Sequence, residues 1–221
     1  MSHRGPEVTT DNGTVASPEL AQHWDNVFST NPVTDLSWYQ WRPTASLAML
    51  DAAGIAPDAA VIDVGGGAST LVDALLERGF RDVTVLDISP AALTAARTRL
   101  SPCAGASWIA ADLLQWQPTR QYDVWHDRAV FHFLTEPADR DRYRRALSAA
   151  LRPGGLVVIG TFSPRGPDSC SGLRAVRYDA DQLAGQLGVG FQVVASHHEP
   201  HVTPADRIQE FTWLAARRTA G

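Results

Sequence analysis

From residue 60 onward, short apolar runs alternate with segments of helical period. Predicted strands cover 60–64, 83–88, 107–110, 122–127, 156–162, 191–196 and 208–216, and the helices between them cover 69–78, 90–100, 138–151 and 179–187. Buried strands that alternate with helices of roughly 10–15 residues are typical of parallel sheets. We therefore predict an α/β fold with a doubly wound, mostly parallel seven-stranded sheet and helices on both faces.

The last two predicted strands break this alternation. Only the segment His197–Arg207 joins them, and it is too short for a helix that crosses over the sheet. We therefore expect these strands to pair antiparallel as a C-terminal hairpin.

The N-terminal part has a different pattern. Residues 1–17 have no hydrophobic periodicity and are predicted to be a disordered tail. Ser17-Pro18-Glu19 is typical of a helix start, and helices are expected over 18–28 and 43–53. The predicted division is a tail (1–17), a helical cap or lid (18–58) and a Rossmann-like domain (59–221).

Composition limits the possible partners. The chain has 221 residues, 44% of them hydrophobic, which suits a globular protein. Its net charge of −5 disfavours binding to nucleic acid. No apolar run reaches the roughly 18 residues of a spanning helix, so no membrane segment is expected. Two cysteines, Cys103 and Cys170, suit a reducing cytoplasm. A monomer or homodimer is expected.

Candidate chemistry follows the ends of three successive strands. The first strand ends in Asp63-Val64-Gly65-Gly66-Gly67-Ala68-Ser69, where glycines allow a tight turn and a close approach to a ligand. Asp87 ends the second strand, where an acidic side chain can accept both hydroxyls of a ribose. Asp112 follows the third strand and suits an adenine amino group. Each position has a simpler interpretation, as a structural turn or a helix cap.

Taken together, the Asp-x-Gly-x-Gly turn with Asp87 and Asp112 resembles the class I S-adenosylmethionine-dependent methyltransferases. The resemblance covers roughly residues 40–216 and includes the turn Arg152-Pro153-Gly154-Gly155. It implies S-adenosyl-L-methionine as cofactor and S-adenosyl-L-homocysteine as product. The cofactor-binding residues that it implies are Trp38, Tyr39, Asp63, Gly65, Gly66, Gly67, Ser69, Asp87, Ile88, Asp112, Leu113 and His126, with Ile88 and Leu113 on either side of the adenine.

The resemblance also points to two branches of that family. Asp127-Arg128, followed by Tyr143 and the Pro-Gly-Gly turn, looks like the thiopurine and thiol methyltransferases, whereas Ser37-Trp38-Tyr39-Gln40 looks like a branch that includes protein-lysine methyltransferases. In this family the end of the fourth strand reaches the methyl donor. His126, Asp127 and His132 are therefore the candidate catalytic residues.

Two further segments are candidates for the acceptor site. Trp38, Tyr39 and Trp41 are expected to form part of a lid that excludes water, although simple packing on the sheet would also explain them. The long connection 163–178 should overhang the carboxyl edge of the sheet. Candidate substrate residues are Trp41, Arg165, Cys170, Arg174 and His198. His197, His198 and His201 lie close in sequence, but no metal is predicted; one of them is an alternative general base.

We therefore expect a methyltransferase (class 2.1.1) that acts on a small-molecule sulfur, oxygen or nitrogen nucleophile. A protein-lysine methyltransferase is the first alternative. More remote alternatives are an NAD-dependent oxidoreductase, which the serine at position 69 disfavours, and a protein that binds the cofactor without turnover.

Overall fold

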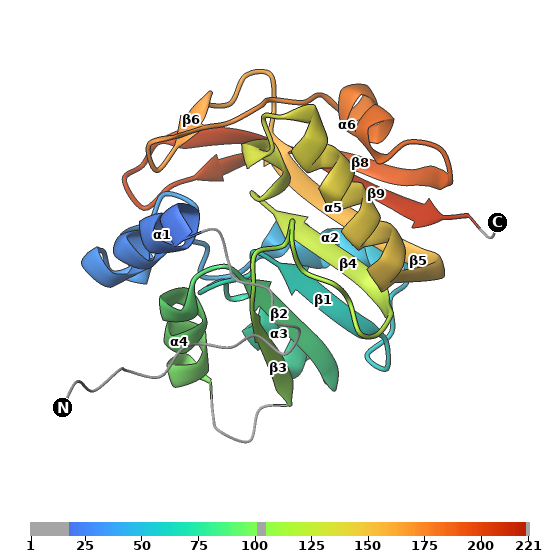
Figure 1. The fold of residues 1–221 in the computed structure, drawn as a ribbon, viewed down its shortest axis with the longest axis horizontal. Helices are drawn as coiled ribbons and strands as arrows, with labels where there is room; N and C mark the ends of the chain where they lie inside the picture. The colour runs from blue at the N-terminus through green and yellow to red at the C-terminus, as the bar shows by residue number, and fades with distance from the viewer. Residues whose placement is uncertain (1–17, 101–104, 220–221) are drawn as a thin grey trace.

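The structure is a computed structural model that describes residues 18–100 and 105–219, and a twisted seven-stranded sheet forms its centre (Figure 1). The strand order is β3-β2-β1-β4-β5-β9-β8. These strands are β1 (Ala60–Val64), β2 (Asp82–Asp87), β3 (Ala106–Ala110), β4 (Tyr122–Arg128), β5 (Leu151–Phe162), β8 (Phe191–Val202) and β9 (Ile208–Arg218). Strands β1 to β5 run parallel, and β9 pairs antiparallel with both β5 and β8. The predicted fold class and the antiparallel hairpin are confirmed.

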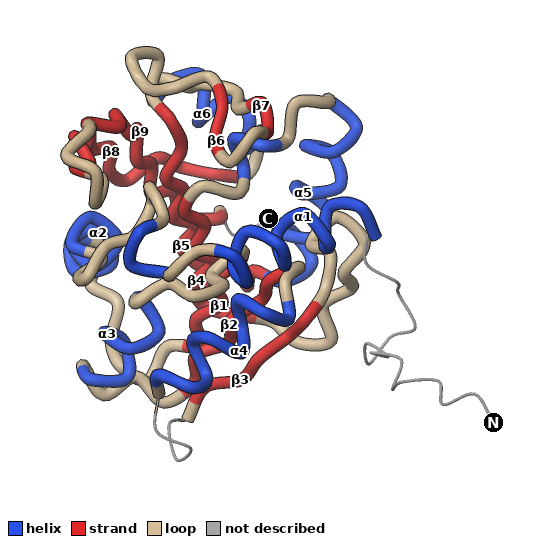
Figure 2. The backbone as a smooth tube through the Cα atoms, turned by 90° about the vertical axis from the view of Figure 1, so that its left-hand side faces the viewer, coloured by secondary structure: helices blue, strands red, loops and turns tan. Residues whose placement is uncertain are grey.

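Helices cover both faces of this sheet. They are α1 (Pro18–Thr30), α2 (Thr44–Ala52), α3 (Leu71–Glu77), α4 (Pro90–Arg99), α5 (Pro137–Ala150) and α6 (Ala180–Leu187), with short 3₁₀ turns η1 (Val33–Asp35) and η2 (Phe131–Phe133). Helices α2, α3 and α4 contribute to the core on one face, and α5 and α6 to the core on the other. Figure 2 shows α2 and α3 on one side of the sheet and α5 on the opposite side.

The central strands are apolar because both of their faces are covered. All five residues of β1 are buried, with Val61 in the core under α2 and α3 and Ile62 in the core under α5. Helix α4 begins where the sequence predicts: the Ser89 hydroxyl accepts a hydrogen bond from the Ala92 amide at 3.1 Å, and Pro90 occupies the first turn.

Strand β5 is longer than the prediction. It begins at Leu151 rather than residue 156, because Leu151 already pairs with Tyr122. The register then shifts before Val124 pairs with Leu156, so the Arg152-Pro153-Gly154-Gly155 segment forms an irregularity within the strand instead of a turn before it.

The predicted loop between the last two strands is largely strand. The sequence pattern predicts a loop over His197–Arg207, but β8 continues to Val202 and only 203–207 connect it to β9. Most residues of β8 face solvent, so this strand lacks the alternation of apolar and polar residues from which strands are predicted. The register of β8 also shifts between Val193 and Ala195, and Pro200 lies within the strand.

A small hairpin interrupts the connection from β5 to α6. It consists of β6 (Ser169–Cys170) and β7 (Leu173–Arg174), which pair antiparallel. Ser171 and Gly172 form its turn with φ values of 50° and 78°. The sequence predicts an overhanging connection here but no strand, because two paired residues leave no periodic pattern.

Some predictions fall outside the described residues. The tail 1–17, the helix cap at Ser17 and the cysteine at position 103 belong to this group. Among the described residues, no helix has both the length and the apolarity that crossing a membrane requires.

A buried hydrogen-bond chain gives a test of this core. The indole N–H of Trp125 donates to the Tyr143 hydroxyl at 2.8 Å, and this hydroxyl donates to the Asp127 carboxylate at 2.8 Å. Tyr143→Phe leaves a buried donor and a buried acceptor without this partner, so it should lower the free energy of unfolding by about 2–4 kcal/mol. Urea denaturation measures the change. Tyr39→Phe, outside the core, is the control, and an equal loss in both variants would contradict the prediction.

Candidate functional site

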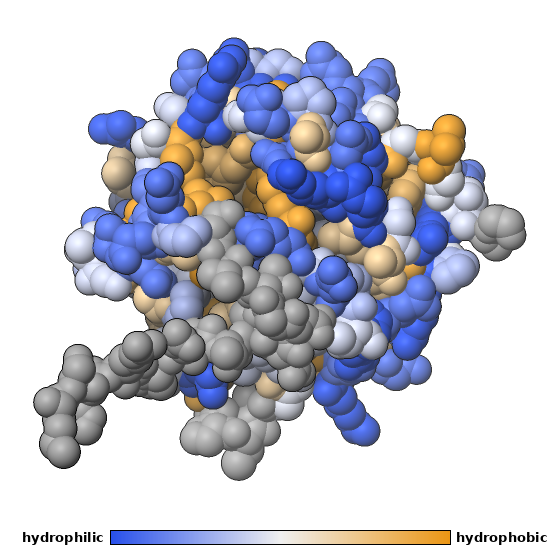
Figure 3. Space-filling view, viewed as in Figure 1, coloured by the Kyte–Doolittle hydropathy of each residue, from blue (hydrophilic) through white to orange (hydrophobic). Residues whose placement is uncertain are grey.

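A cavity of about 360 Å³ opens at the carboxyl ends of the parallel strands. Side chains from α1, the ends of β2, β3 and β4, and the β6–β7 hairpin line it. Figure 3 shows hydrophobic side chains in a recess of the surface between α1, β6 and α5. In open α/β sheets, ligands bind at this edge.

The glycine turn after β1 forms one wall of the site. Gly65 and Gly67 have φ values of 64° and 42°, which favour glycine. A Cβ atom on Gly65 would overlap Cγ2 of Val130, and one on Gly67 would lie 2.8 Å from a carboxylate oxygen of Asp87. A Cβ atom on Gly66 would lie 2.5 Å from a carboxylate oxygen of Asp63. The turn therefore has no room for side chains and brings backbone to the cavity.

Asp87 lines the cavity at the end of β2 and is 7% exposed. One carboxylate oxygen accepts the Ser89 amide at 2.8 Å. Burial raises the pKa of Asp87 to about 7; the carboxylates of Asp63 and Asp25 raise it further, and the amides of Ser89 and Gly67 act against this. Such a carboxylate gains most from a ligand that donates hydrogen bonds to it.

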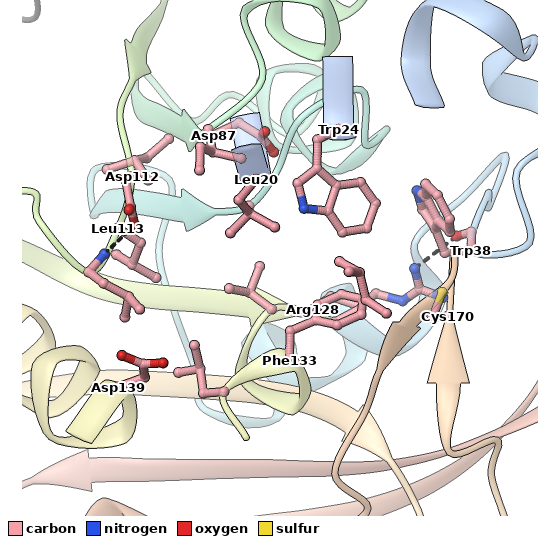
Figure 4. Close-up of a pocket in the computed structure, with 18 of the residues that line it drawn as sticks. Leu20, Trp24, Trp38, Asp87, Asp112, Leu113, Arg128, Phe133, Asp139 and Cys170 are labelled. Carbon is pink, nitrogen blue, oxygen red and sulfur yellow. Dashed lines mark hydrogen bonds between the residues drawn. The ribbon is translucent and has the colours of Figure 1, made fainter. Parts of the chain in front are cut away.

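The residues predicted to hold an adenine also line the cavity. Ile88, Asp112 and Leu113 follow the ends of β2 and β3. The Asp112 carboxylate accepts the Leu114 amide at 2.9 Å and the Gln115 side-chain amide at 2.9 Å, so it also fixes its own turn. In Figure 4, Asp112 and Leu113 lie at one end of the cavity, with Asp87 between them and Trp24.

Asp63 lies beneath the glycine turn rather than in the cavity wall. One carboxylate oxygen is 2.7 Å from Nδ1 of His126, and Nε2 of His126 is 2.9 Å from the Ser46 hydroxyl. All three side chains are buried. The second carboxylate oxygen of Asp63 is buried and has no hydrogen-bond partner in the described part of the chain. His126 therefore positions Asp63 and does not reach the cavity itself.

The other two candidate catalytic residues are also buried outside the cavity wall. Asp127 accepts hydrogen bonds from the Val130 amide and from Tyr143, and burial raises its pKa to about 6 against these bonds. His132 stacks on Phe162 with ring centroids 4.4 Å apart, and burial lowers its pKa to about 3. Both side chains are fully buried, so neither is placed to exchange a proton with a ligand in the cavity.

The aromatic segment 37–41 is divided between two environments. Trp38 lines the cavity and packs edge-to-face against Trp24 of α1, with ring centroids 5.9 Å apart. Tyr39 is half-buried and lies outside the cavity, and Trp41 is 78% exposed. Ser69 is also exposed, and its hydroxyl accepts the Leu71 amide at 3.1 Å.

The structure separates the candidate substrate residues. Cys170 and Arg174, on the β6–β7 hairpin, line the cavity. Arg165 and His198 lie together at another surface, where Nη2 of Arg165 is 3.3 Å from Nε2 of His198. His201 is buried, and its Nε2 donates to the Ser37 carbonyl at 2.8 Å. Within the described ranges, no group of three His, Cys, Asp or Glu side chains is arranged to hold a metal ion.

Sequence analysis missed two parts of the cavity. Leu20, Trp24 and Phe28 of α1 line it; their helical spacing indicates a helix with one apolar face, but not that this face lines a cavity. Arg128 and Phe133, after β4, line it as well. No sequence pattern distinguishes an arginine that turns into a cavity from one on the surface.

Comparisons with known proteins agree with this architecture. A family model described as a methyltransferase domain matches residues 62–157. A trans-aconitate 2-methyltransferase from Rhizobium etli is 28% identical over 157 residues, which are 71% of this chain and 57% of that protein. The chain thus spans about half the length of the curated relatives it matches.

Two solved structures share the fold. One comes from a study of the conversion of a disulfide bond into a thioacetal group during echinomycin biosynthesis; it is 26% identical with a TM-score of 0.69, over 90% of this chain and 93% of that one. The other is the N-methyltransferase NodS from Bradyrhizobium japonicum in complex with S-adenosyl-L-homocysteine. It is 17% identical with a TM-score of 0.67, over 89% of this chain and 98% of that one.

The attachment of α1 to α4 gives a test of the cavity wall. One oxygen of Asp25 accepts the Ser89 hydroxyl at 2.5 Å and the Ala91 amide at 3.1 Å. Asp25→Ala removes both bonds, while Ser89 still caps α4. Amide exchange across 18–30 should become about tenfold faster, since about 1.4 kcal/mol of local stability is lost. Asn26→Ala, exposed on the same helix, is the control. Unchanged exchange in Asp25→Ala would show that other contacts hold α1 in place.

Proposed function

We propose that this chain, which belongs to the class I S-adenosylmethionine-dependent methyltransferases, transfers a methyl group from S-adenosyl-L-methionine to a small molecule. The observation that carries this proposal is the cavity at the strand ends, where the glycine turn, Asp87 and Asp112 converge. The domain division into a cap (18–58) and a Rossmann-like domain (59–221) belongs to the same proposal.

The residues present fit this cofactor. Asp87 would accept the ribose hydroxyls, and Ile88 and Leu113 would contact the adenine on its two faces, beside Asp112. Asp63 lies beneath the turn and outside the cavity wall, so it would attract the ammonium group of a methionine part by its charge and not by direct contact. Gly65 and Gly67 allow the tight turn that brings backbone to the cavity. Tyr39, Ser69 and Gly66 would act through the position of the turn and not by direct contact.

When bound, the cofactor supplies an electrophilic methyl group on a sulfonium. The protein then has to align a nucleophile, exclude water and hold both molecules close together. Aromatic side chains of Trp24, Trp38 and Phe133 give the cavity an apolar wall, and an aromatic face stabilises a nearby cation. Because His126, Asp127 and His132 do not line the cavity, we infer that the acceptor arrives as a soft or already deprotonated nucleophile.

The name of a relative favours a small acceptor over a protein. One relative is named for trans-aconitate and one structural neighbour is an N-methyltransferase, so the relatives leave the accepting atom open.

The test combines binding and turnover. S-adenosyl-L-methionine and S-adenosyl-L-homocysteine should raise the melting temperature, by the equivalent of about 2.7 kcal/mol at a hundredfold excess over the dissociation constant, and NAD should not. A panel of thiols, phenols, amines, carboxylates and halides is then screened for production of S-adenosyl-L-homocysteine. Stabilisation by NAD alone would overturn the proposal. A labelled protein band from radiolabelled donor and lysate would instead support the lysine alternative.

Asp87 provides the sharpest test of cofactor binding. Asp87→Ala removes two acceptors for the ribose hydroxyls, so it should weaken binding of S-adenosyl-L-homocysteine roughly ten- to a thousandfold. The maximal rate at saturating donor should fall much less, because the ribose lies away from the transferred methyl. Calorimetry and steady-state kinetics measure the two effects. Asp58→Ala, outside the cavity, is the control. Equal affinity in wild type and Asp87→Ala would move the adenosine site elsewhere.

Cofactor affinity should also depend on pH. The raised pKa of Asp87, about 7, means that part of the carboxylate is protonated near neutral pH in the free protein. Hydroxyl donors bind the ionised form better, so affinity should rise as pH increases from about 6 to about 8, by at most about tenfold per pH unit, with release of a proton on binding. Asp87→Asn should remove this part of the pH dependence. Identical pH profiles for the two proteins would contradict the assignment.

A further inference from the structure

Arg128 is a cation with incomplete partners at the end of β4. Its Nη1 donates to the Trp38 carbonyl at 2.8 Å, and its guanidinium lies over the Phe211 ring at 4.9 Å. Its Nε and Nη2 are buried and meet no hydrogen-bond acceptor in the described residues. Burying a charge without complete hydrogen bonding costs several kcal/mol, so a purely structural role does not account for this arginine.

The acidic neighbours of Arg128 form their hydrogen bonds with other residues. The Glu199 carboxylate accepts the Gln40 amide at 2.8 Å and the Trp213 indole at 2.7 Å, and one carboxylate oxygen of Asp63 is bound to His126. The other oxygen of Asp63 has no hydrogen-bond partner in the described residues, Arg128 included. Burial lowers the pKa of Arg128, and the nearby Glu199, Cys170 and Asp63 only partly offset this. A guanidinium stays protonated in proteins, so the charge persists.

The two donors without partners define the chemistry of a ligand. Nε–H and Nη2–H lie along one edge of the planar guanidinium and point in parallel directions, which matches the two oxygens of a carboxylate. Lysine has no such edge, and this chain contains only arginine as a basic residue apart from histidine.

The location of Arg128 favours the acceptor over the donor. Figure 4 shows Arg128 with Trp38 and Cys170 at the end of the cavity opposite Asp112 and Leu113. Its ring contact, Phe211, belongs to β9, whereas the predicted contacts of the ribose and adenine, Asp87 and Asp112, follow β2 and β3. Asp87 at the donor end would repel a carboxylate.

The β6–β7 hairpin forms the cavity wall at this end. It contributes Cys170, Leu173 and Arg174 to the cavity, and Cys170 anchors it in the hydrophobic core. Arg128 itself lines the cavity, but its Nε and Nη2 are buried. A ligand that binds these two atoms therefore requires a shift of the Arg128 side chain or of the hairpin.

We propose that Arg128 is a specificity-determining residue that binds a carboxylate of the methyl acceptor through Nε and Nη2. The proposal rests on the function proposed above and adds the substrate class: small anionic acceptors, with the nucleophile on the same molecule. Exposed Arg174 at the cavity lining adds positive charge on the path of such an anion.

The first experiment measures anion binding to the protein saturated with S-adenosyl-L-homocysteine. Matched pairs of small carboxylates and their carboxamides, such as benzoate and benzamide, sulfanylbenzoate and sulfanylbenzamide, and dicarboxylates with their diamides, are titrated calorimetrically. At least one carboxylate should bind about ten- to a hundredfold more tightly than its amide, as expected for two charge-assisted hydrogen bonds. If no pair is discriminated, the proposal is overturned.

Variants then assign this preference to Arg128. Arg128→Met should abolish the discrimination, and Arg128→Lys should retain only part of it, because an ammonium lacks the parallel donors. Arg97→Met, an exposed arginine at the end of α4, is the matched control and should keep the full preference. If Arg128→Met is misfolded by circular dichroism, Arg128→Lys decides the question. A carboxylate preference that survives in both Arg128 variants would overturn the assignment.

A second arm separates the acceptor from the donor, which also carries a carboxylate. S-adenosyl-L-homocysteine and 5′-methylthioadenosine, which lacks the amino-acid part, are titrated against wild type and Arg128→Lys. If only S-adenosyl-L-homocysteine loses about tenfold or more in affinity, Arg128 serves the donor carboxylate and the proposal is overturned. Similar affinities in both proteins support it. If neither nucleoside binds the wild type, the proposed function fails first, so the two failures are distinguishable.

Discussion

The glycine turn after β1 is the constraint on which the rest of the site depends. Each of its three glycines lies against a different side chain, namely Val130 after β4, Asp63 in β1 and Asp87 at the end of β2. A Cβ atom added to any one of these glycines would displace the side chain that it meets, and with it the strand end that carries this side chain. The close approach of backbone to three strand ends makes one cavity from residues that are far apart in sequence. Burial is the main cause of the raised pKa of Asp87, and the charge of Asp63 adds to it.

The central sheet could be predicted from the sequence because its strands are buried on both faces. Such strands are continuous apolar runs, and the predicted bounds of β1 agree with the observed ones. Prediction failed where burial is one-sided or pairing is short. Most of β8 faces solvent at the sheet edge, so the sequence of its second half resembles a loop, and the β6–β7 hairpin is too short for any pattern. The irregular start of β5 at Leu151 depends on its partner strand, which no local sequence records.

The candidate site was predictable where a residue's role follows from its place at a strand end. Asp87, Ile88, Asp112 and Leu113 line the cavity as that reasoning implied. Side-chain direction was not predictable in the same way. His126 and Asp127 are neighbours in β4, and each is bound into the core by its own partners, Asp63 and Tyr143. The sequence identifies Arg128 only through a family resemblance. Its burial could not be predicted, because it depends on Phe211 and Trp38, which are distant in sequence.

The edge strand β8 has a consequence for the protein in a crowded solution. A long strand at the rim of a sheet offers its unpaired backbone groups to any other extended chain, and this invites aggregation. Here the register shift next to Val193 distorts the rim, and Pro200 removes one donor from it. These two irregularities make the rim a poor template for strand addition, although Val193, Val194 and Val202 are exposed along it. The same strand that closes the sheet therefore limits its growth by further strands from other molecules.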